Sequence, residues 1–352
     1  MKLIITIDTE GDNQWDPALS QSTDNIRFIP RFQDLCERYD FKPTYLCTYE
    51  VAAAPAFDEI LLPLHESTRA EIGAHLHPWT SPPYSRWDRS ETVAAYPSEL
   101  PAGVFARKLE CLTALLASKL RAPPRSYRAG RWGLSAAHIP VLLQCGYIVD
   151  CSVTPLVSWG DAGARERGQD FREAPAAPYF MAWGDPAREG ASGLLEVPVT
   201  ILYTNAWMRR SPWLRAAYRR HRKTRPARLL NRMFSIAPQW FRPFSDMSVA
   251  RLKAVHETAR RLELPVIEMM FHSSELMPNG SPHNPTAESV ERLYQRLEGI
   301  FAYLAGQRAE SITLSAFAEP LRRQSIARGK LVDFSSDELT WAPSRGVVKH
   351  DG

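Results

Sequence analysis

The 352-residue sequence lacks any long hydrophobic segment. Its apolar runs fall short of the roughly 18 to 20 residues that a helix needs to cross a bilayer. Its first residues also show no basic region followed by an apolar core and a cleavage site, the pattern of a secretory signal. We therefore expect a cytoplasmic protein. With 44% hydrophobic residues, the chain can bury one barrel-sized core or two smaller ones.

Cysteine is scarce as well. The five cysteines are an odd number, and no two of them form a C-x-x-C pair. Most of them lie within apolar patterns typical of helices and strands; they are Cys36, Cys47, Cys111, Cys145 and Cys151. We therefore expect reduced thiols in a protein core, as is usual in a reducing compartment.

Acidic residues are missing from one long window of the chain. Between Pro198 and Ser245 there is no Asp or Glu, although this window holds eleven Arg and Lys residues. Because the net charge of the whole chain is only +4, the remainder is acidic. A basic patch this concentrated predicts an anionic partner, such as a phosphate-bearing substrate, a membrane surface or a nucleic acid.

The N-terminal stretch joins an apolar strand to a cluster of acids. Residues 3–7 are mostly β-branched and typical of a strand that is buried on both faces, and Asp8, Glu10 and Asp12 follow directly. Asp8 and Glu10 are two residues apart, so a strand would project both to one side, where they can hold a cation and a proton. Taken alone, the acids are as well explained by the start of a solvated loop.

Strands and helices alternate along the rest of the chain. We expect strands at about 42–51, 71–79, 126–133, 147–152, 194–203, 265–272 and 311–315, and helices at about 24–40, 57–66, 104–120, 135–145, 245–262 and 284–307. Long insertions follow the fifth and sixth strands. Seven or eight such units predict a barrel or a doubly wound sheet. We favour the barrel, because polar residues follow several separate strands and a barrel gathers those strand ends at one rim.

Two histidines stand at the end of the third expected strand. His75 and His77 are two residues apart, so both rings can point the same way and bind one metal ion. With Glu10 they complete a set of two histidines and one carboxylate, which is typical of catalytic zinc with a position left for water. An H-x-H pair alone is an ordinary loop feature, but its pairing with D-x-E on another strand end favours a metal site.

Five short motifs carry a resemblance to a known family. They are T-I-D-T-E at 6–10, E-I-G-A-H-L-H at 71–77, Y-R-A-G-R-W-G at 127–133, G-Y-I-V-D-C-S at 146–152 and M-F-H-S at 270–273. In this order they resemble the NodB-type polysaccharide deacetylases, the fourth carbohydrate esterase family, from residue 6 to about 318. The resemblance implies an α/β fold, a distorted (β/α) barrel with seven or eight strands. It also implies an enzyme that removes an N-acyl group, less often an O-acyl group, from a sugar with a divalent metal, for which we expect Zn²⁺.

The same resemblance implies a role for each matching residue. Asp8 would be the general base, held in place by Arg128, and His272 would be the general acid, oriented by Asp150. The metal ligands would be Glu10, His75 and His77. Substrate contacts are expected from residues within or next to the motifs, partly because aromatic faces can stack on sugar rings; they are Trp79, Tyr127, Arg131, Trp132 and Ser273.

The chain departs from the family pattern at two places. The second metal histidine usually stands four residues after the first, where this chain has Trp79, and we expect His77 to replace it. An allantoinase-like branch of the superfamily also has tryptophan there and works without a tightly bound metal. The first motif is D-x-E rather than the commoner D-D, so either Glu10 or Asp12 could be the carboxylate ligand.

Several functions and one domain division follow as expectations. The leading function is deacetylation of an amino sugar in a bacterial surface polysaccharide or in its lipid-linked precursor. The alternatives are another C–N hydrolase, such as a deformylase or an allantoinase-like enzyme, and a glycan-binding barrel without turnover. The barrel is expected over 1–325, including a basic aromatic insertion at about 204–244, with a C-terminal arm or tail at 326–352.

The Arg-rich segment 209–232 mixes cationic side chains with aromatic and aliphatic ones. This mixture predicts a peripheral contact with an anionic surface, either the inner face of the membrane or a lipid-phosphate-linked glycan. A solvated pair of helices that covers the barrel explains the segment equally well. Nucleic-acid binding is a weaker option, because no recognised nucleic-acid-reading module accompanies the patch.

Overall fold

The computed structural model describes residues 1–14, 22–85, 96–160 and 168–331. Its strands are β1 (Lys2–Thr9), β2 (Thr44–Cys47), β3 (Glu71–Leu76), β4 (Ser126–Ala129), β5 (Val149–Asp150), β6 (Tyr179–Ala182), β7 (Asp185–Glu189), β8 (Leu195–Glu196), β9 (Ile201–Leu202), β10 (Gln239–Trp240), β11 (Val266–His272) and β12 (Glu310–Ser311). Its α-helices are α1 (Ile29–Arg38), α2 (Tyr49–Ala53), α3 (Leu62–Glu66), α4 (Ala102–Leu120), α5 (His138–Gln144), α6 (Ala206–Arg210), α7 (Pro212–His221), α8 (Arg225–Phe234), α9 (Val249–Arg261), α10 (Ala287–Gly306) and α11 (Leu314–Ala327).

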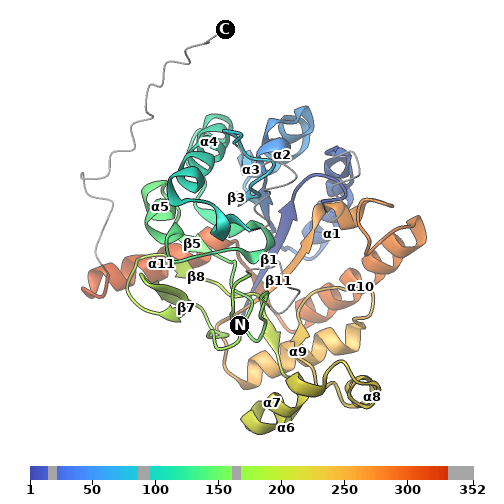
Figure 1. Ribbon diagram of the computed structural model, residues 1–352. Helices are drawn as coiled ribbons and strands as arrows, with labels where there is room; N and C mark the ends of the chain where they lie inside the picture. The colour runs from blue at the N-terminus through green and yellow to red at the C-terminus, as the bar shows by residue number, and fades with distance from the viewer. Residues whose placement is uncertain (15–21, 86–95, 161–167, 332–352) are drawn as a thin grey trace.

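One curled sheet forms the centre of the molecule (Figure 1). Its strands follow the order β11-β1-β2-β3-β4-β5-β8-β6-β7, and β12 also pairs with β1. The strands from β11 to β8 are parallel to their neighbours, whereas β6 and β7 form an antiparallel extension. Neighbouring strands follow chain order from β1 to β5, without the reversal of a doubly wound sheet. The predicted distorted (β/α) barrel is therefore confirmed.

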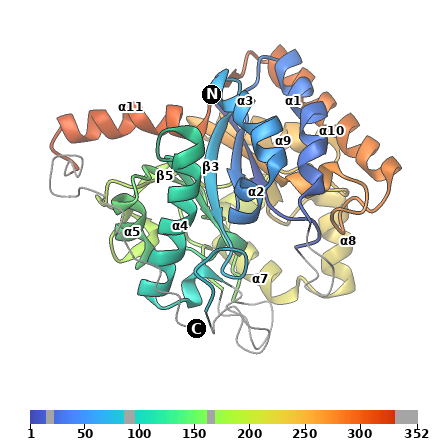
Figure 2. The same cartoon turned by 90° about the horizontal axis from the view of Figure 1, so that it is seen from above.

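Strand β1 shows how alternation along the sequence builds the two faces of the sheet. Leu3, Ile5 and Ile7 pack in the main core. Helices surround the sheet on its outer side (Figure 2). Ile4 belongs to a second core inside the curl, and because side chains alternate, Thr6 and Asp8 share its face. All of these side chains are buried. The inner face therefore becomes polar toward the C-terminal end of the strand.

The curl is closed by a short connection between β8 and β11. Residues 197–200 continue from β8 without forming a regular strand. There, Thr200 Oγ1 accepts a hydrogen bond of 2.8 Å from the backbone N–H of Glu268, and the Thr200 N–H lies 3.4 Å from the carbonyl oxygen of the same residue. This seam joins the last parallel strand back to β11 and brings the strand ends around one rim.

Helix α11 covers the N-terminal end of the curled sheet. Leu314 and Phe317 of this helix pack with Ile4 in the second core. Its first turn is held by Glu71 of β3, whose carboxylate accepts a hydrogen bond of 3.0 Å from the Ser315 N–H. The interior is thus apolar at this end and polar at the opposite rim.

Several predicted elements have different boundaries in the structure. The second strand ends at Cys47, and the predicted residues 49–51 belong to α2 instead. The sixth predicted strand is divided into β8 and β9, with the seam between them. The helix predicted from residue 284 begins at Ala287, because Thr286, and not the Asn284–Pro285 pair, is its N-cap. Helix α11 was not predicted. The division at residue 325 stays a prediction, since 332–352 lie outside the described residues.

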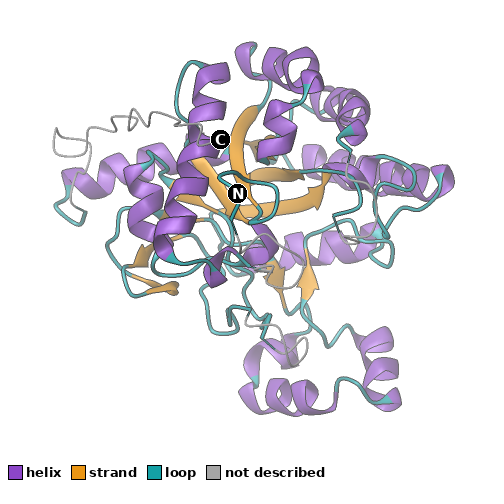
Figure 3. Cartoon of the chain, turned by 45° about the horizontal axis from the view of Figure 1, so that its top comes forward, coloured by secondary structure: helices purple, strands orange, loops and turns teal. Residues whose placement is uncertain are grey.

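The basic insertion forms a separate group of helices. Helices α6, α7 and α8 project from the barrel beside α9, as Figures 1 and 3 show. The antiparallel pair β9–β10 connects them to the barrel. Among the described helices, none combines the length and the apolar character required to cross a bilayer.

Candidate active site

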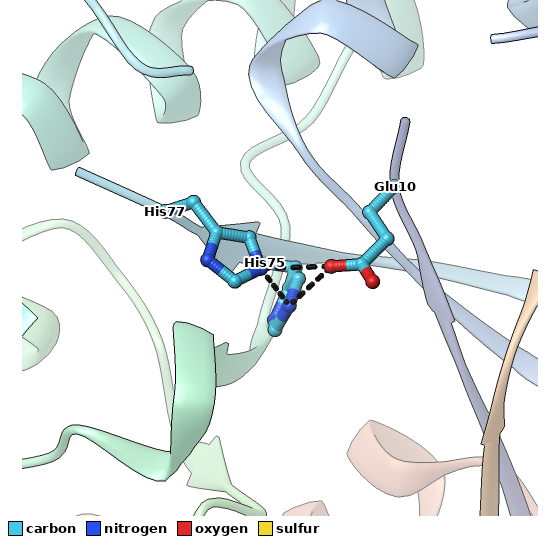
Figure 4. A group of neighbouring side chains, drawn as sticks. All are labelled: Glu10, His75 and His77. Carbon is cyan, nitrogen blue, oxygen red and sulfur yellow. Dashed lines mark hydrogen bonds and ion pairs between the residues drawn. The ribbon is translucent and has the colours of Figure 1, made fainter. Parts of the chain in front are cut away.

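Glu10, His75 and His77 converge where β1 and β3 end (Figure 4). The Nε2 atom of His77 lies 2.7 Å from Glu10 Oε2 and 3.1 Å from His75 Nε2. His75 Nε2 is 3.5 Å from the same Glu10 oxygen. All three side chains are buried. Two imidazole nitrogens and one carboxylate oxygen therefore face one common point.

Contacts behind His75 fix which of its nitrogens faces that point. Its Nδ1 lies 3.0 Å from the carbonyl oxygen of Arg128. A carbonyl oxygen only accepts, so Nδ1 carries a proton, and the neutral ring would present the Nε2 lone pair toward Glu10 and His77. Burial lowers the pKa of His75, but the Asp8 and Glu10 carboxylates outweigh it and raise the pKa, so a metal ion would displace a proton from Nε2. Close packing also positions His77, because a Cβ atom at Gly130 would lie 2.5 Å from His77 Nδ1. Glycine at 130 is what allows the two strand ends to approach this closely.

The three side chains fit a divalent metal ion. Ligand atoms on a tetrahedral zinc ion are about 3.3 Å apart, since zinc–nitrogen distances are about 2.0 to 2.1 Å. The observed separations of 2.7 to 3.5 Å lie around this value. Burial lowers the pKa of His77, so this ring is neutral near pH 7 and can bind a metal. Burial raises the pKa of Glu10, but His272, His75 and His77 outweigh this effect and keep the carboxyl ionised.

Of the two acids that the sequence left open as ligands, Glu10 faces the histidines. The carboxylate of Asp12 instead accepts hydrogen bonds of 3.1 Å from the backbone N–H groups of Asp24 and Asn25. It also bonds the side chains of Ser22 and Asn25. Asp12 therefore orders the turn that follows β1, and its oxygens are directed away from His75 and His77.

Asp8 is paired with a buried arginine. Arg128 Nη1 donates a hydrogen bond of 2.6 Å to Asp8 Oδ1, and its Nη2 donates one of 2.7 Å to Glu268 Oε1 on β11. Burial raises the pKa of Asp8, but Arg128, His75 and His272 outweigh it, so the pKa lies below its ordinary value. The expected contact between Arg128 and Asp8 is present. Asp8 is thus an ionised, firmly held carboxylate at the rim.

His272 faces both carboxylates of the site. Its Nε2 is 3.9 Å from Asp8 Oδ2 and 3.9 Å from Glu10 Oε1. Both distances are longer than a direct hydrogen bond. One small group that lies between His272, Asp8 and Glu10 could contact all three side chains. The register of the sheet explains the proximity, because Asp8 and His272 are direct partners on β1 and β11.

The carboxylate that contacts His272 is that of Glu275, and not that of Asp150 as expected. Glu275 Oε1 lies 3.0 Å from His272 Nδ1, and Arg242 Nη2 lies 2.5 Å from Glu275 and 3.0 Å from His272. Burial raises the pKa of Glu275, but Arg242 and His272 bring it down to about 2. Glu275 can accept a hydrogen bond from Nδ1 of His272. When the ring is charged, Nδ1 donates to Glu275 and Nε2 carries a second proton that faces the site.

Asp150 is occupied elsewhere in the barrel. Its oxygens accept hydrogen bonds of 2.8 and 2.9 Å from the backbone N–H and the hydroxyl of Ser152. Its register partner on β8 is Glu196, whose Oε1 accepts a hydrogen bond of 2.9 Å from the Val153 N–H. Burial raises the pKa of both carboxyl groups. Asp150 therefore holds the segment that follows β5 and does not contact His272.

The expected substrate-binding residues fall into two groups. Trp79 and Trp132 lie beside the site: the Trp79 ring is 4.4 Å from the His77 ring, and Trp132 lies under the Arg128 guanidinium at 5.1 Å. The exposed Arg131 lies over Tyr96. Tyr127 and Ser273 do not fit the expected role, because both are fully buried. Tyr127 packs against Tyr147 in the main core, and Ser273 Oγ lies 3.4 Å from the Glu10 N–H.

Sequence reasoning missed Glu268, Glu275 and Arg242. Glu268 had a signal, because it is the one acid within the apolar run of β11 and shares a strand face with His272. Glu275 stands three residues after His272, where it completes a capping box at the start of a short 3-10 helix. Arg242 gave no such signal. It was counted in the basic window, and only the fold shows that it turns inward.

Comparisons with known proteins bear on the fold. No protein-family model matches the sequence, and no curated protein matches it. Among solved structures, a protein of Mycobacterium smegmatis assigned as a polysaccharide deacetylase is similar, with a TM-score of 0.52 and 15% identity over 92% of this chain and 91% of that chain. The allantoinase Puue is similar too, with a TM-score of 0.51 and 13% identity over 93% of this chain and 89% of that chain. At these identities the likeness shows a shared fold.

Proposed function

We propose that this protein, which has the fold of the polysaccharide deacetylases, is a carbohydrate deacetylase that hydrolyses the N-acetyl or another N-acyl group of an amino sugar with the help of a divalent metal, most simply Zn²⁺. The substrate would be a polysaccharide or its lipid-linked precursor. The observation that carries the proposal is the convergence of a His₂Glu set with Asp8 and His272 at one rim. These are the groups that hydrolysis of an unreactive amide requires.

The chain's own residues can supply proton transfer at both ends of the reaction. Asp8, kept ionised beside Arg128, would take a proton from the attacking water. The charged form of His272 would give its Nε2 proton to the departing amine nitrogen and become neutral, while Glu275 and Arg242 hold the ring. A metal ion bound by Glu10, His75 and His77 would polarise the acyl carbonyl and acidify water.

Aromatic residues at the rim suit a sugar substrate. Trp132 stacks on Trp159 with ring centroids 6.2 Å apart, and Trp240 packs against both. Trp79 lies beside His77. Flat apolar faces next to polar groups are typical of sites that bind pyranose rings, whose C–H faces need an apolar surface.

A second enzymatic function remains a candidate because of Trp79. The fold is shared about equally with a polysaccharide deacetylase and with an allantoinase. The His₂Glu set favours the metal-dependent deacetylase, since Glu10 and His77 provide ligands even though Trp79 stands where the family usually has its second histidine. A glycan-binding protein without turnover would have no use for Asp8 and His272 in this arrangement.

One experiment tests the proposed function directly. Purified protein, with its metal content determined, is incubated with N-acetylglucosamine oligomers, an N-formylated amino sugar and allantoin, and released acetate, formate and allantoate are measured. We expect acetate release that is lost after chelation and restored by Zn²⁺. Release of formate or allantoate alone would assign the alternative C–N hydrolase, and no turnover of any substrate by metal-loaded protein would contradict the proposal.

Removal of His77 is expected to abolish tight metal binding. Because the loss of outer partners of a ligand already lowers metal affinity about 10- to 100-fold, His77→Ala should lower zinc affinity by more than about 100-fold. Calorimetric titration with Zn²⁺ measures this effect without reference to activity. His221→Ala, a change on the exposed side of α7, is the control and should bind like the wild type. Unchanged affinity in His77→Ala would restrict the site to Glu10 and His75.

Loss of the Glu275 carboxylate is expected to slow turnover without weakening substrate binding. In Glu275→Gln, His272 loses a charged partner on Nδ1, and a misplaced catalytic group can cost about 100-fold in rate. We expect kcat to fall about 10- to 100-fold, with KM within about 2-fold of the wild type. Glu291→Gln, at an exposed ion pair with Arg31, is the control. A rise in KM at constant kcat would show that Glu275 does not act through His272.

A further inference from the structure

The helical lobe, residues 205–235, concentrates the exposed apolar surface of the protein. Eleven large hydrophobic side chains of the described residues are exposed, and six of them lie in this lobe: Trp207, Trp213, Leu229, Leu230, Met233 and Phe234. Trp207 and Trp213 are 75% and 74% exposed, and Met233 is 64% exposed. Apolar residues scattered singly need no explanation, but this many on one small lobe indicate a surface that contacts something else.

Helix α8 separates its side chains into three faces. At 100° per residue, Leu229, Leu230, Met233 and Phe234 project to one side, and Arg225, Arg228 and Arg232 project to another. The third face turns to the rest of the protein: Ala227 is buried there, and the Asn231 side chain accepts a hydrogen bond of 2.7 Å from the Ala237 N–H. The apolar and basic faces therefore lie side by side on the outside.

The charge of the lobe has one sign. Residues 205–235 contain ten Arg and Lys residues and no Asp or Glu. Exposed basic residues elsewhere on the protein commonly face acids, as in the pairs Arg38–Glu298 and Arg323–Glu319. If the lobe were only a solvated pair of helices, we would expect acids among its basic residues and few exposed leucine, methionine and phenylalanine side chains. The lobe is therefore complementary to a surface that is both anionic and apolar.

The lobe is also firmly attached at its base. The Asn205 side chain caps α6 and donates a hydrogen bond of 3.1 Å to the carbonyl oxygen of Phe234, which ties the first residue of the lobe to the end of α8. Arg209 donates hydrogen bonds to the carbonyl oxygens of Tyr203 and Thr204, just before the lobe. Arg215 donates to two carbonyl oxygens within the lobe, those of Met208 and Arg209. Its outer faces are thus presented by an ordered unit.

We propose that the helical lobe docks on the surface of an anionic lipid bilayer. Interfacial helices bury aromatic and aliphatic side chains at the headgroup boundary while arginine side chains bind lipid phosphates, and α7 and α8 offer both kinds of residue. A nucleic acid would use the arginines but not the aliphatic face of α8. This inference goes beyond the proposed function and does not depend on it.

Flotation with lipid vesicles tests the proposal on the full chain. Vesicles of phosphatidylcholine are compared with vesicles that contain 30% phosphatidylglycerol, at about 0.1 M salt. We expect recovery mainly with the anionic vesicles. Each basic residue near such a surface gives roughly a 5-fold gain in partitioning, so Arg220→Gln, Arg228→Gln and Arg232→Gln together should lower binding by more than about 10-fold. Leu229→Ser, Met233→Ser and Phe234→Ser together should lower it similarly.

A matched charge control separates the lobe from net charge. The triple variant Arg38→Gln, Arg107→Gln and Arg323→Gln removes the same number of exposed charges from α1, α4 and α11, and it should float like the wild type. Equal recovery from neutral and anionic vesicles would overturn the proposal. A second pair of results would also overturn it: tight binding of single-stranded RNA to the lobe, together with full binding of the serine variant to anionic vesicles. The lobe would then bind through its charge alone, without its apolar face.

Discussion

Replacement of Asp8 by asparagine is expected to lower kcat for N-acetyl hydrolysis by at least about 100-fold. The variant keeps the shape of the side chain and an oxygen that can accept from Arg128, while it removes the group that accepts a proton from water. Arg128 also keeps its second carboxylate, Glu268, so the fold should persist. Acetate release by protein with a measured zinc content gives kcat and KM.

Two controls make the Asp8 result specific. Asp58→Asn removes an exposed carboxylate that pairs with Lys119 and should leave kcat unchanged. Zinc titration of Asp8→Asn should give nearly wild-type affinity, because the ligand set is Glu10, His75 and His77. If Asp8→Asn kept kcat within about 3-fold of the wild type, Asp8 would not be the general base. If it lost zinc instead, Asp8 would contribute to the metal site.

Arg128→Met is expected to destabilise the protein by about 3 to 5 kcal/mol. The guanidinium is fully buried and neutralises both Asp8 and Glu268. Methionine fills similar space but leaves two carboxylates close together without a cation. Arg128 also donates from Nε to the Cys151 carbonyl oxygen at 2.9 Å, so the link between β4 and the segment after β5 is lost too. Urea unfolding followed by circular dichroism measures the free energy of unfolding.

An exposed ion pair provides the comparison for Arg128. Arg31→Met breaks a pair with Glu291 in which both side chains are about half exposed, and such pairs contribute no more than about 1 kcal/mol. Arg128→Lys keeps the charge but cannot reach both carboxylates as a planar fork, so its stability should lie between those of Arg128→Met and the wild type. Equal losses in Arg128→Met and Arg31→Met would show that the buried network does not stabilise the barrel.

Much of the fold and of the rim was predictable, because both follow from periodicity. The apolar runs marked the parallel strands, and the first polar residues after β1, β3 and β11 were expected at one rim. Asp8, Glu10, His75, His77 and His272 do lie together there. Acids and histidines are seldom placed beside a buried core unless they have a function there. When several strands end in such residues, a shared site at the barrel rim is the simplest explanation. Their catalytic roles stay predictions.

The residues that were misplaced depend on register or on contacts between distant segments. Asp150 lies at a strand end as expected, but only the fold shows that its oxygens bond Ser152 and that Glu196 stands beside it on β8. Tyr127 alternates to the outer face of β4, next to Arg128 on the inner face, so the motif alone could not separate a core residue from a site residue. The inward position of Arg242 depends on the path of the whole insertion, which the sequence does not show.

The position of β1 in the sheet has a consequence for how the chain matures on the ribosome. Strand β1 lies between β2 and β11, and its register places Lys2 against Val266, about 260 residues later in the chain. At about 5 to 20 residues per second, roughly 13 to 50 seconds separate the emergence of the two strands. During that interval one edge of β1, which carries Leu3, Ile4, Ile5 and Ile7, has no strand to pair with. The β1–β11 pairing that completes the barrel is therefore a late event in synthesis.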